Sequence, residues 1–474
     1  MPSRALSLFL SIAAIALALP HDVHAFGSID PFNTAASTPP RPALTGASAE
    51  STKPCTPPPA GTPLNVIDTV DLALCKNPLT SEIWANARAQ AALVGVAQGA
   101  YLPSLDGKLG SNRITTNAVE SKQRSASLTL SWLLFDFGAR SANLDNARQL
   151  LEAASATLDS TVQTVFLNAL QSYYAAQASR AALAAAQESE KASRESLSAA
   201  EVRYRVGTGT PADRLQAQTA WSQATLNRIK FEGEVRNSLG TLANVMGLDA
   251  NQPLILADIP AIQPDIAFEK DVDALIEEAR QRRPDLKSAE SQLKAAQSNV
   301  DYTRTSGLPA LSLSAGPSWL ETSNAAGNVS THTSAIGLTV TLPIFSGLST
   351  TYKVRNAEAQ ADAKAAQRDR IRLQVALDVW KAYQNLTTAN QSIKTTIDLL
   401  NSAEQSERVA LGRYKAGVGN ILDVLNAQTA LAAARLQRIQ ATLDWHVYRA
   451  TLAQAIGALD NSLLQAAASG KQQP

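Results

Sequence analysis

The sequence has 474 residues, a formal net charge of +1 and a hydrophobic content of 45%, so it is long enough to bury a large core. The near-neutral charge gives no basic patch for a polyanion, and we expect no nucleic-acid partner. Only four His and two Cys are present, and no Gly-rich phosphate loop or Gly-x-Ser-x-Gly motif occurs, so we expect no enzyme, no cofactor and no metal site.

The N-terminus has the pattern of a secretory signal peptide, which we place at residues 1–25. Arg4 precedes an apolar run from Ala5 to Leu19, and Val23-His24-Ala25 has the small-x-small form that signal peptidase accepts. A retained membrane anchor is the alternative, but this run is shorter than the roughly twenty residues of a spanning helix. No Cys follows the cleavage site closely, so no N-terminal lipid is expected, and no later apolar stretch approaches a membrane helix. The mature chain is therefore either soluble or inserted as strands.

Residues 26–64 form a segment rich in Pro, Ser, Thr and Ala, which cannot bury enough apolar surface to offset the entropy of ordering. We expect this segment to be disordered or to follow the surface of a folded unit. Cys55 lies in the segment, and Cys75 lies in the first predicted helix. Because an exported chain meets an oxidising compartment, a disulfide between these two residues is favoured over two free thiols.

Each half of the chain opens with a predicted helix and continues with a predicted β-hairpin. The helices cover residues 68–100 and 271–306, and each is interrupted by a proline, Pro78 or Pro284. Apolar residues then alternate with Ser, Thr or Gly, which is the period of a strand. The expected strands lie near residues 105–116, 127–132, 311–315 and 336–342, and the hairpin loops near residues 117–122 and 324–330.

The alternation also predicts the environment of these hairpins. Apolar residues on one face and small hydroxyl residues on the other are typical of a barrel wall with lipid outside and water inside. An ordinary soluble hairpin with one face on a core is the alternative. In a barrel, Trp132 and Trp319 are expected near its ends, where indole rings suit the membrane interface.

A very long helix is predicted after each hairpin. The 68 residues from Ala139 to Val206 contain no Gly or Pro, and a continuous helix of that length measures roughly 100 Å, wider than any globular core. Residues 348–411 match it in the second half. Alternating three- and four-residue spacing predicts coiled-coil seams on this second helix and on the returning helix. The seam residues are Val379, Ala382, Leu386, Ala389, Ile393, Thr396, Leu400 and Ala403, then Leu422, Leu425, Thr429, Ala432, Leu436, Ile439, Leu443 and His446. His446 is therefore interpreted as a packed residue rather than a ligand.

A turn motif ends each long helix and occurs at residues 204–218 and again at residues 414–428, an offset of 210. In both copies Tyr, a basic residue and an apolar residue precede a Gly, a second Gly follows two positions later, and an Asp lies in the next helical turn. This pattern predicts a tight turn between two helices.

The repeat covers most of the chain. Pro103 matches Pro309 at an offset of 206, whereas Gly138 matches Gly347 at 209, so the length difference falls between Pro103 and Gly138, as expected for a variable loop. The predicted units are a first repeat at residues 65–247, a Pro-containing linker at 248–270, a second repeat at 271–457 and a polar tail at 458–474. One chain supplies about four strands, too few to close a barrel, and open strand edges cannot face lipid. Several chains must therefore assemble.

The doubled turn, the Leu-Pro before each first strand, and the motifs at residues 134–138 and 343–347 resemble the outer membrane factor family, the TolC-like group of exit ducts. The resemblance covers about residues 65–460. It implies a mainly α-helical fold with a membrane β-barrel: a homotrimer with a twelve-stranded barrel in outer membrane lipid and a coiled-coil α-helical tunnel across the periplasm.

The resemblance also implies partners at the helical turns. A periplasmic adaptor, or membrane fusion protein, would dock at Gly207, Thr208, Gly209, Gly417 and Val418 and connect the duct to an inner-membrane ABC-type or drug-efflux transporter. Within the family the chain is most similar to the outer membrane component of a type I system that exports a cyclolysin-type toxin. A multidrug efflux duct is the first alternative, and a soluble periplasmic coiled-coil adaptor is the alternative from another class.

Family members narrow and close the tunnel entrance with aspartates and with Tyr, Arg and Asp side chains near the turns. The resemblance places the first pore aspartate on Asp423, the lock tyrosine on Tyr414 and the first-half lock aspartate on Asp213. It places the second pore aspartate on Asn426 and the lock arginine on Gly419, so a two-ring entrance and an arginine lock are both in doubt. Asp213 and Asp423 also fit carboxylates that the helix dipole favours at a helix N-terminus.

Overall fold

The computed structural model describes residues 30–42, 62–116, 119–258, 271–324 and 327–459. The predicted signal peptide, Cys55 and the polar tail from residue 460 lie outside these ranges. The disulfide between Cys55 and Cys75 therefore stays a prediction.

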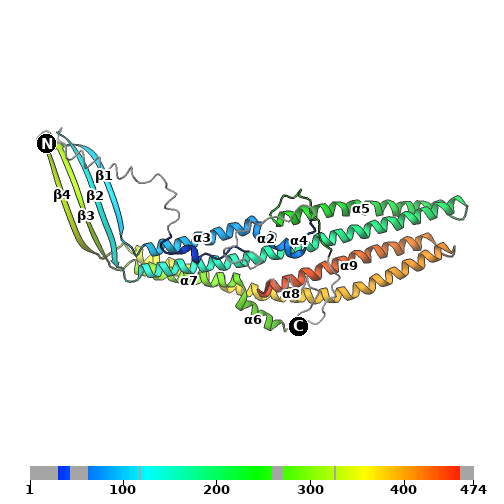
Figure 1. Ribbon diagram of the computed structural model, residues 1–474. Coiled ribbons are helices and arrows are strands. Elements are labelled where there is room, and N and C mark those ends of the chain that lie inside the picture. The colour runs from blue at the N-terminus through cyan, green and yellow to red at the C-terminus, as the bar shows by residue number, and fades with distance from the viewer. Residues whose placement is uncertain (1–29, 43–61, 117–118, 259–270, 325–326, 460–474) are drawn as a thin grey trace.

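Four antiparallel strands form one sheet at one end of the molecule, in the order β1-β2-β3-β4 (Figure 1). The strands are β1 (Ser104–Thr116), β2 (Val119–Phe135), β3 (Ala310–Asn324) and β4 (Gly327–Thr341). Each half contributes one hairpin, and β2 pairs with β3 to join them. The predicted hairpin loops were too long, because pairing continues to Thr116 with Val119 and to Asn324 with Gly327. Polar residues occupy both faces there, so the alternation that marks the rest of the strands fades although the backbone remains paired.

One face of the sheet is apolar across all four strands. In the register, Leu105, Leu130, Ala315 and Ile336 form one row, and Trp132, Leu313 and Leu338 form part of the next. The opposite face carries a parallel row of Ser104, Ser131, Ser314 and Gly337. This is the two-faced pattern of a wall between lipid and water.

The two tryptophans lie at the two ends of this apolar band. Trp132 lies three residues before the end of β2, and its indole N–H donates to the Tyr101 carbonyl at 2.9 Å. Trp319 lies two residues before Glu321, which faces Arg124 at 3.9 Å where charged residues replace apolar ones on this face. Both positions suit indoles at a membrane interface.

The helices repeat in the same order in each half. The first half has α2 (Val66–Lys76), α3 (Pro78–Gly99), α4 (Ala139–Arg205) and α5 (Pro211–Val245), and the second has α6 (Val272–Arg282), α7 (Pro284–Thr305), α8 (Ser349–Lys415) and α9 (Ile421–Ile456). The two long helices, α4 and α8, both have 67 residues and run from the sheet to the far tip (Figure 1). None of the helices in the described ranges has an apolar stretch long enough to cross a bilayer.

The length difference between the halves lies in the link from the second strand to the long helix. The two hairpins span equal lengths, but residues 136–138 connect β2 to α4, whereas residues 342–348 connect β4 to α8. The match of Gly138 with Gly347 was wrong by one position. Two residues with positive φ precede each long helix: Phe137 and Gly138 before α4, and Gly347 and Leu348 before α8. The second of each pair caps the helix, with φ of 93° and 64°, so the long helices align at the same offset as the turns. Glycine usually takes this conformation, and no local pattern predicts it for Phe137 or Leu348.

The predicted seam of α8 is confirmed at most positions, with Val379, Ala382, Leu386 and Ile393 all buried. The predicted seam of α9 is confirmed at Leu425, which is buried, but it is out of phase elsewhere: Leu422 is 44% exposed, whereas Ile421, Val424 and Ala427 are buried. The physical reason is that α9 packs against α4 as well as α8, so its buried face is not the stripe that a two-helix seam requires.

In each half, the break between the two short helices contacts the end of the helix that returns from the far tip. In the first half the Asn77 side chain donates to the Val245 carbonyl at 3.0 Å, which joins the break between α2 and α3 to the end of α5. In the second half the Arg283 side chain donates to the Ala455 carbonyl at 3.4 Å in the same way. Beside α4, the break before Pro78 therefore lies where α3 begins and α5 ends. Beside α8, the break before Pro284 lies where α7 begins and α9 ends.

Two described parts of the irregular segments follow the helical surface. Residues 30–42 lie along α3, where the Trp84 indole donates to the Pro39 carbonyl at 3.0 Å and Arg41 stacks on the same indole at 4.4 Å. Leu64 forms a parallel bridge with Leu256, which lies in the predicted linker, and both residues pack against α4. Of the two expectations for the Pro-rich segment, residues 30–42 show the surface-following one.

Candidate functional site

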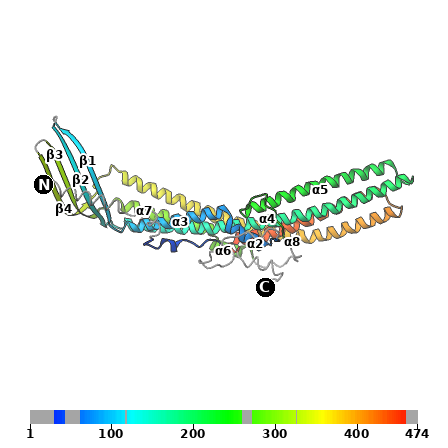
Figure 2. The ribbon, with the colours of Figure 1, turned by 45° about the horizontal axis from the view of Figure 1, so that its top comes forward.

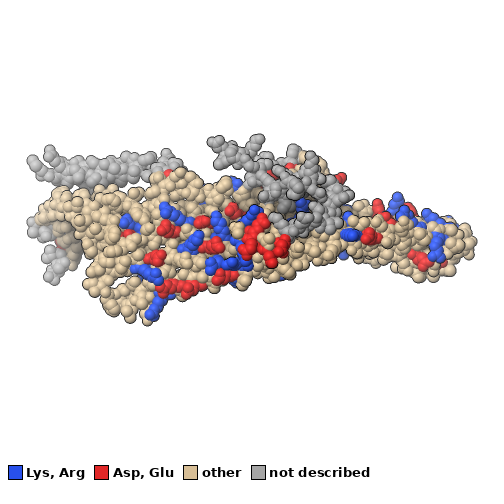
Figure 3. All heavy atoms as spheres, turned by 90° about the horizontal axis from the view of Figure 1, so that it is seen from below, with Lys and Arg blue, Asp and Glu red and all other residues tan. Residues whose placement is uncertain are grey.

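The two predicted turns lie side by side at the tip farthest from the sheet (Figures 1 and 2). Ala200 and Ala217 of the first helical pair pack against Tyr414, Ile421 and Val424 of the second, which forms a small apolar cluster at this end. Figure 3 shows charged side chains over the helices beside the sheet and again at this tip, while the strand end is mostly uncharged on the face in view. The tip is therefore a closed contact between the two halves with a charged surface.

Both turns have the same geometry. Gly207 and Gly417 adopt φ of 80° and 82°, and their N–H groups donate to the carbonyls of Tyr204 and Tyr414 at 3.1 and 3.0 Å. Each long helix thus ends in a left-handed glycine, as the motif predicted. Thr208, Gly417 and Val418 lie at the exposed crest of these turns.

Gly419, and Gly209 in the equivalent position, are packed against the preceding helix. A Cβ atom on Gly419 would lie 2.9 Å from the Tyr414 nitrogen and 3.0 Å from the Arg413 carbonyl carbon, and a Cβ on Gly209 would lie 3.1 Å from the Tyr204 nitrogen. At these three distances a side chain fits only if the preceding backbone shifts. The position that the resemblance assigned to the lock arginine therefore has no room for an arginine in this turn.

The two helix-end aspartates differ in what they bind. The Asp213 carboxylate accepts from the Thr210 backbone N–H at 3.0 Å, and the Thr210 hydroxyl accepts from the Asp213 N–H, a reciprocal capping box. At the second turn Asn420 caps the Leu422 N–H instead. The Asp423 side chain is exposed and makes no hydrogen bond or ion pair with the described residues. Asp213 is thus committed to its own helix, whereas Asp423 is available to solvent or to ions.

Asn426 is exposed one helical turn after Asp423, so the two side chains share one face of α9. The structure therefore brings together the two positions that the resemblance assigned to the pore. Only the first carries a charge.

Tyr414 is 5% exposed and is contacted by an arginine from the other half. The Arg203 guanidinium carbon, at the end of α4, lies 4.1 Å from the centre of the Tyr414 ring, and the same guanidinium donates to the Tyr414 carbonyl oxygen. Burial raises the pKa of the Tyr414 hydroxyl, against an opposing effect of Arg203.

Sequence reasoning missed Arg203. The signal was present, because Arg203-Tyr204 and Arg413-Tyr414 are equivalent pairs within the doubled motif. The equivalence does not indicate that one arginine crosses to the tyrosine of the other half, since that contact depends on how the two helical pairs pack.

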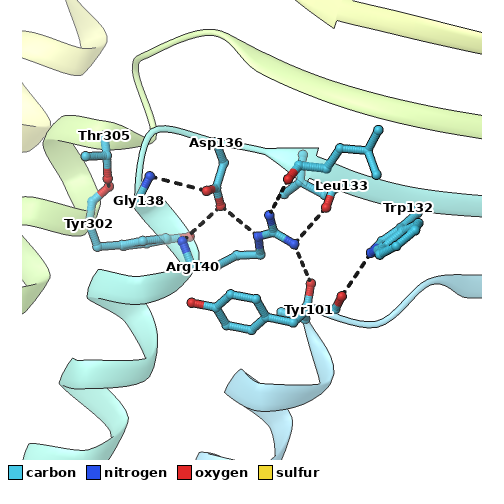
Figure 4. Close-up of polar contacts among 10 residues, drawn as sticks. Tyr101, Trp132, Leu133, Asp136, Gly138, Arg140, Tyr302 and Thr305 are labelled. Carbon is cyan, nitrogen blue, oxygen red and sulfur yellow. Dashed lines mark hydrogen bonds and ion pairs between the residues drawn. The ribbon is translucent and has the colours of Figure 1, made fainter.

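A second polar cluster joins the sheet to the long helix (Figure 4). The Arg140 guanidinium donates to the carbonyls of Leu133 and Leu134 at 2.7 and 3.3 Å and to the Ala100 carbonyl at 3.5 Å. It pairs with Asp136 at 3.0 Å and lies 4.8 Å from the centre of the Tyr101 ring. One side chain therefore connects the ends of β2, α3 and α4.

Asp136 completes this junction by capping the long helix. It accepts from the backbone N–H groups of Gly138 and Arg140 at 3.3 and 2.9 Å. At the equivalent place in the second half, Ser346 accepts from the Thr350 N–H at 3.4 Å, without a guanidinium to tie the neighbouring strand. The first junction is therefore short and tied, and the second is longer and held by a single neutral cap.

His446 is a packed residue, as expected. Its ring stacks on Tyr174 of α4 with the centroids 4.3 Å apart. Burial, helped by the charge of Arg449, lowers the pKa of His446 to about 4. Burial also raises the pKa of Tyr174 to about 12, so both rings are neutral at ordinary pH.

Comparisons with known proteins agree with this architecture. A family model described as outer membrane efflux protein matches residues 69–248 and 275–458, one match for each repeat. Protein CyaE of Bordetella pertussis (strain Tohama I) is 32% identical over 435 residues, which cover 89% of this chain and 90% of that protein. Outer membrane efflux protein BepC of Brucella suis biovar 1 is 26% identical over 79% of this chain and 81% of its own. The outer-membrane channel OprN has the same fold, with a TM-score of 0.73 at 19% identity over 89% of this chain and 97% of OprN.

These matches confirm the resemblance inferred from the doubled turn and assign the chain to transport across the outer membrane, with its helices extending into the periplasm. They do not support an enzyme or a soluble adaptor. Because the family model matches both repeats and one relative exceeds 30% identity over most of both chains, this chain belongs to the outer membrane efflux protein family.

Proposed function

We propose that three copies of this chain form the outer-membrane duct of a type I secretion system for a protein toxin, with the periplasmic entrance at the α4–α5 and α8–α9 turns. The observation that carries the entrance is the position of these turns at the tip opposite the sheet. A helix of the 67 residues in α4 is about 100 Å long, so a sheet in the outer membrane puts the turns deep in the periplasm.

The edges of the sheet support assembly. Within the described residues β1 and β4 each pair on one side only, and a strand edge with unpaired backbone groups is costly in lipid. Three copies would join β4 of one chain to β1 of the next and close a barrel of twelve strands.

Asp423 supports the role of the tip as an entrance. Its carboxylate has no partner among the described residues and lies on the same exposed face as Asn426. In a trimer this residue would form a ring of three charges; at a spacing of about 8 Å each pair repels by roughly 0.5 kcal/mol in water. Such a ring would select cations and bind multivalent ones.

The crests of the turns would be the docking surface for the periplasmic adaptor. Val206 and Val418 are 66% and 71% exposed, beside the basic residues Arg205 and Lys415. In the proposed interface the adaptor would cover both valines. The adaptor would connect the duct to an inner-membrane ABC-type transporter.

Type I secretion is favoured over drug efflux by the comparison of whole chains. The identity of 32% with protein CyaE exceeds the 26% with the efflux protein BepC, which supports the resemblance of the whole chain to the outer membrane component of a cyclolysin-type exporter.

In-cell crosslinking tests this assignment. In a background with Cys55 and Cys75 replaced by Ser, we expect Thr208→Cys and Val418→Cys to capture a periplasmic adaptor that mass spectrometry assigns to an ABC-transporter system. Leu226→Cys, on an exposed face of α5 away from the turns, is the control and should capture little or none. Capture of a drug-efflux adaptor instead would contradict type I secretion, and equal capture at all three positions would contradict docking at the turns.

A further inference from the structure

We propose that Arg203 is the positioning residue that holds the entrance closed, by tying the end of α4 to the end of α8. The proposal rests on the proposed function, in which these helix ends surround the entrance. It assigns the tie to an arginine at a position other than Gly419, which has no room for a side chain.

The first contact is between the guanidinium and the Tyr414 ring. The guanidinium carbon lies 4.1 Å from the ring centre, and Tyr414 is 5% exposed, so the ring is largely shielded from water while Arg203 is partly exposed. A cation over an aromatic face is attracted by the ring quadrupole, and the attraction grows as water is removed.

The second contact is with the backbone. Arg203 donates to the Tyr414 carbonyl, which also accepts from the Gly417 N–H, in the last turn of α8, where the carbonyl groups carry partial negative charge. One side chain therefore holds both the ring and the main chain of the residue that ends α8. Movement of α8 away from α4 must break both contacts.

The internal repeat provides the matched comparison. In the first half Arg214 lies 5.0 Å from the centre of the Tyr204 ring, a second Arg–Tyr pair at the same tip. Arg214 belongs to α5 and Tyr204 to α4, so this pair joins two helices of one hairpin. Arg203 and Tyr414 belong to different halves. Only the second pair opposes separation of the two helical hairpins.

Separation of the hairpins is the movement that would widen the tip, because each hairpin is closed by its own turn. Loss of Arg203 should therefore favour the open entrance. Loss of Arg214 should leave the entrance unchanged although it removes the same type of residue from the same tip.

Single-channel recording in planar lipid bilayers tests the proposal with purified full-length trimers. We expect Arg203→Ala to raise the fraction of time spent in high-conductance states about fivefold, the factor for loss of one cation–π contact whose cation is partly exposed. Arg203→Lys should be intermediate, since lysine keeps the charge but not the planar stack. Arg214→Ala should behave as the wild type. Arg203→Ala combined with Tyr414→Ala should exceed Tyr414→Ala only by the effect of the lost carbonyl contact, because the two changes share the ring contact.

The outcomes separate this proposal from the proposed function. If the wild type forms channels and Arg203→Ala and Arg203→Lys both conduct as the wild type does, Arg203 does not hold the entrance closed. The proposed function as a duct would be unaffected by that result. An equal increase in Arg214→Ala would also overturn the proposal, because the effect would then be general loosening of the tip. If the wild type forms no channels, the proposed function itself fails.

Discussion

Replacing Arg140 by methionine is expected to lower the free energy of unfolding by about 3 kcal/mol, because it leaves a shielded carboxylate without its cation and several carbonyls without their donor. The side chains of Arg140 and Asp136 are each 13% exposed, and the guanidinium reaches the carbonyls of Leu133, Leu134 and Ala100. Methionine keeps much of the apolar stem, so the loss reports the polar contacts. Urea-induced unfolding of the detergent-solubilised protein, followed by circular dichroism, measures the change.

Arg148→Met is the matched control for Arg140. Arg148 pairs with Asp145 in the same helix at 3.4 Å, and both side chains are 54% exposed, so its loss should cost under about 0.5 kcal/mol. Equal losses for the two variants would show that Arg140 is no more than another surface arginine. The second junction, with Ser346 and Thr350, has no counterpart to this guanidinium, so the destabilisation should be specific to the first half.

The buried imidazole of His446 is expected to make stability depend on pH. Its folded pKa of about 4 lies below the ordinary value of 6.5, so the unfolded chain binds the proton first as the pH falls. The neutral His446 therefore makes its full contribution to the free energy of unfolding above about pH 6.5. This contribution is lost progressively down to about pH 4, by about 3 kcal/mol in all. Thermal unfolding at pH 7, 5.5 and 4 measures it.

His446→Phe isolates this effect from the titration of carboxylates. Phenylalanine can stack on Tyr174 in the same place and carries no proton, so the variant should lose less stability than the wild type between pH 7 and 4. Identical pH profiles for the two proteins would mean that His446 takes up its proton without unfolding.

Local patterns in the sequence were sufficient for the repeated order of elements. The 68 residues without Gly or Pro predicted α4 to within one residue, and the doubled glycines predicted both turns. These features depend on backbone preferences that act within a few residues, so they can be predicted without knowledge of tertiary contacts. The alternating strands were legible for the same reason where one face is apolar.

Features that depend on packing between distant segments were not predicted. The phase of the α9 seam depends on contact with α4, and the left-handed Leu348 is held by a junction that local preference disfavours. The crossing of Arg203 to Tyr414 and the reach of Arg140 to three carbonyls join residues whose pairing leaves no periodic signal. Asp213 is bound in a capping box and Asp423 is not, because Thr210 caps the first helix and Asn420 caps the second.

We propose that this chain forms a duct whose periplasmic entrance is lined by Asp423. The most direct test is single-channel recording in planar bilayers with a trivalent cation added on the side of the helical turns. We predict cation-selective channels that the trivalent ion blocks, with weaker selectivity and block in Asp423→Asn and stronger block in Asn426→Asp, which adds a second ring on the same face. Absence of channels, or channels whose conductance, selectivity and block are the same in all three proteins, would contradict the account.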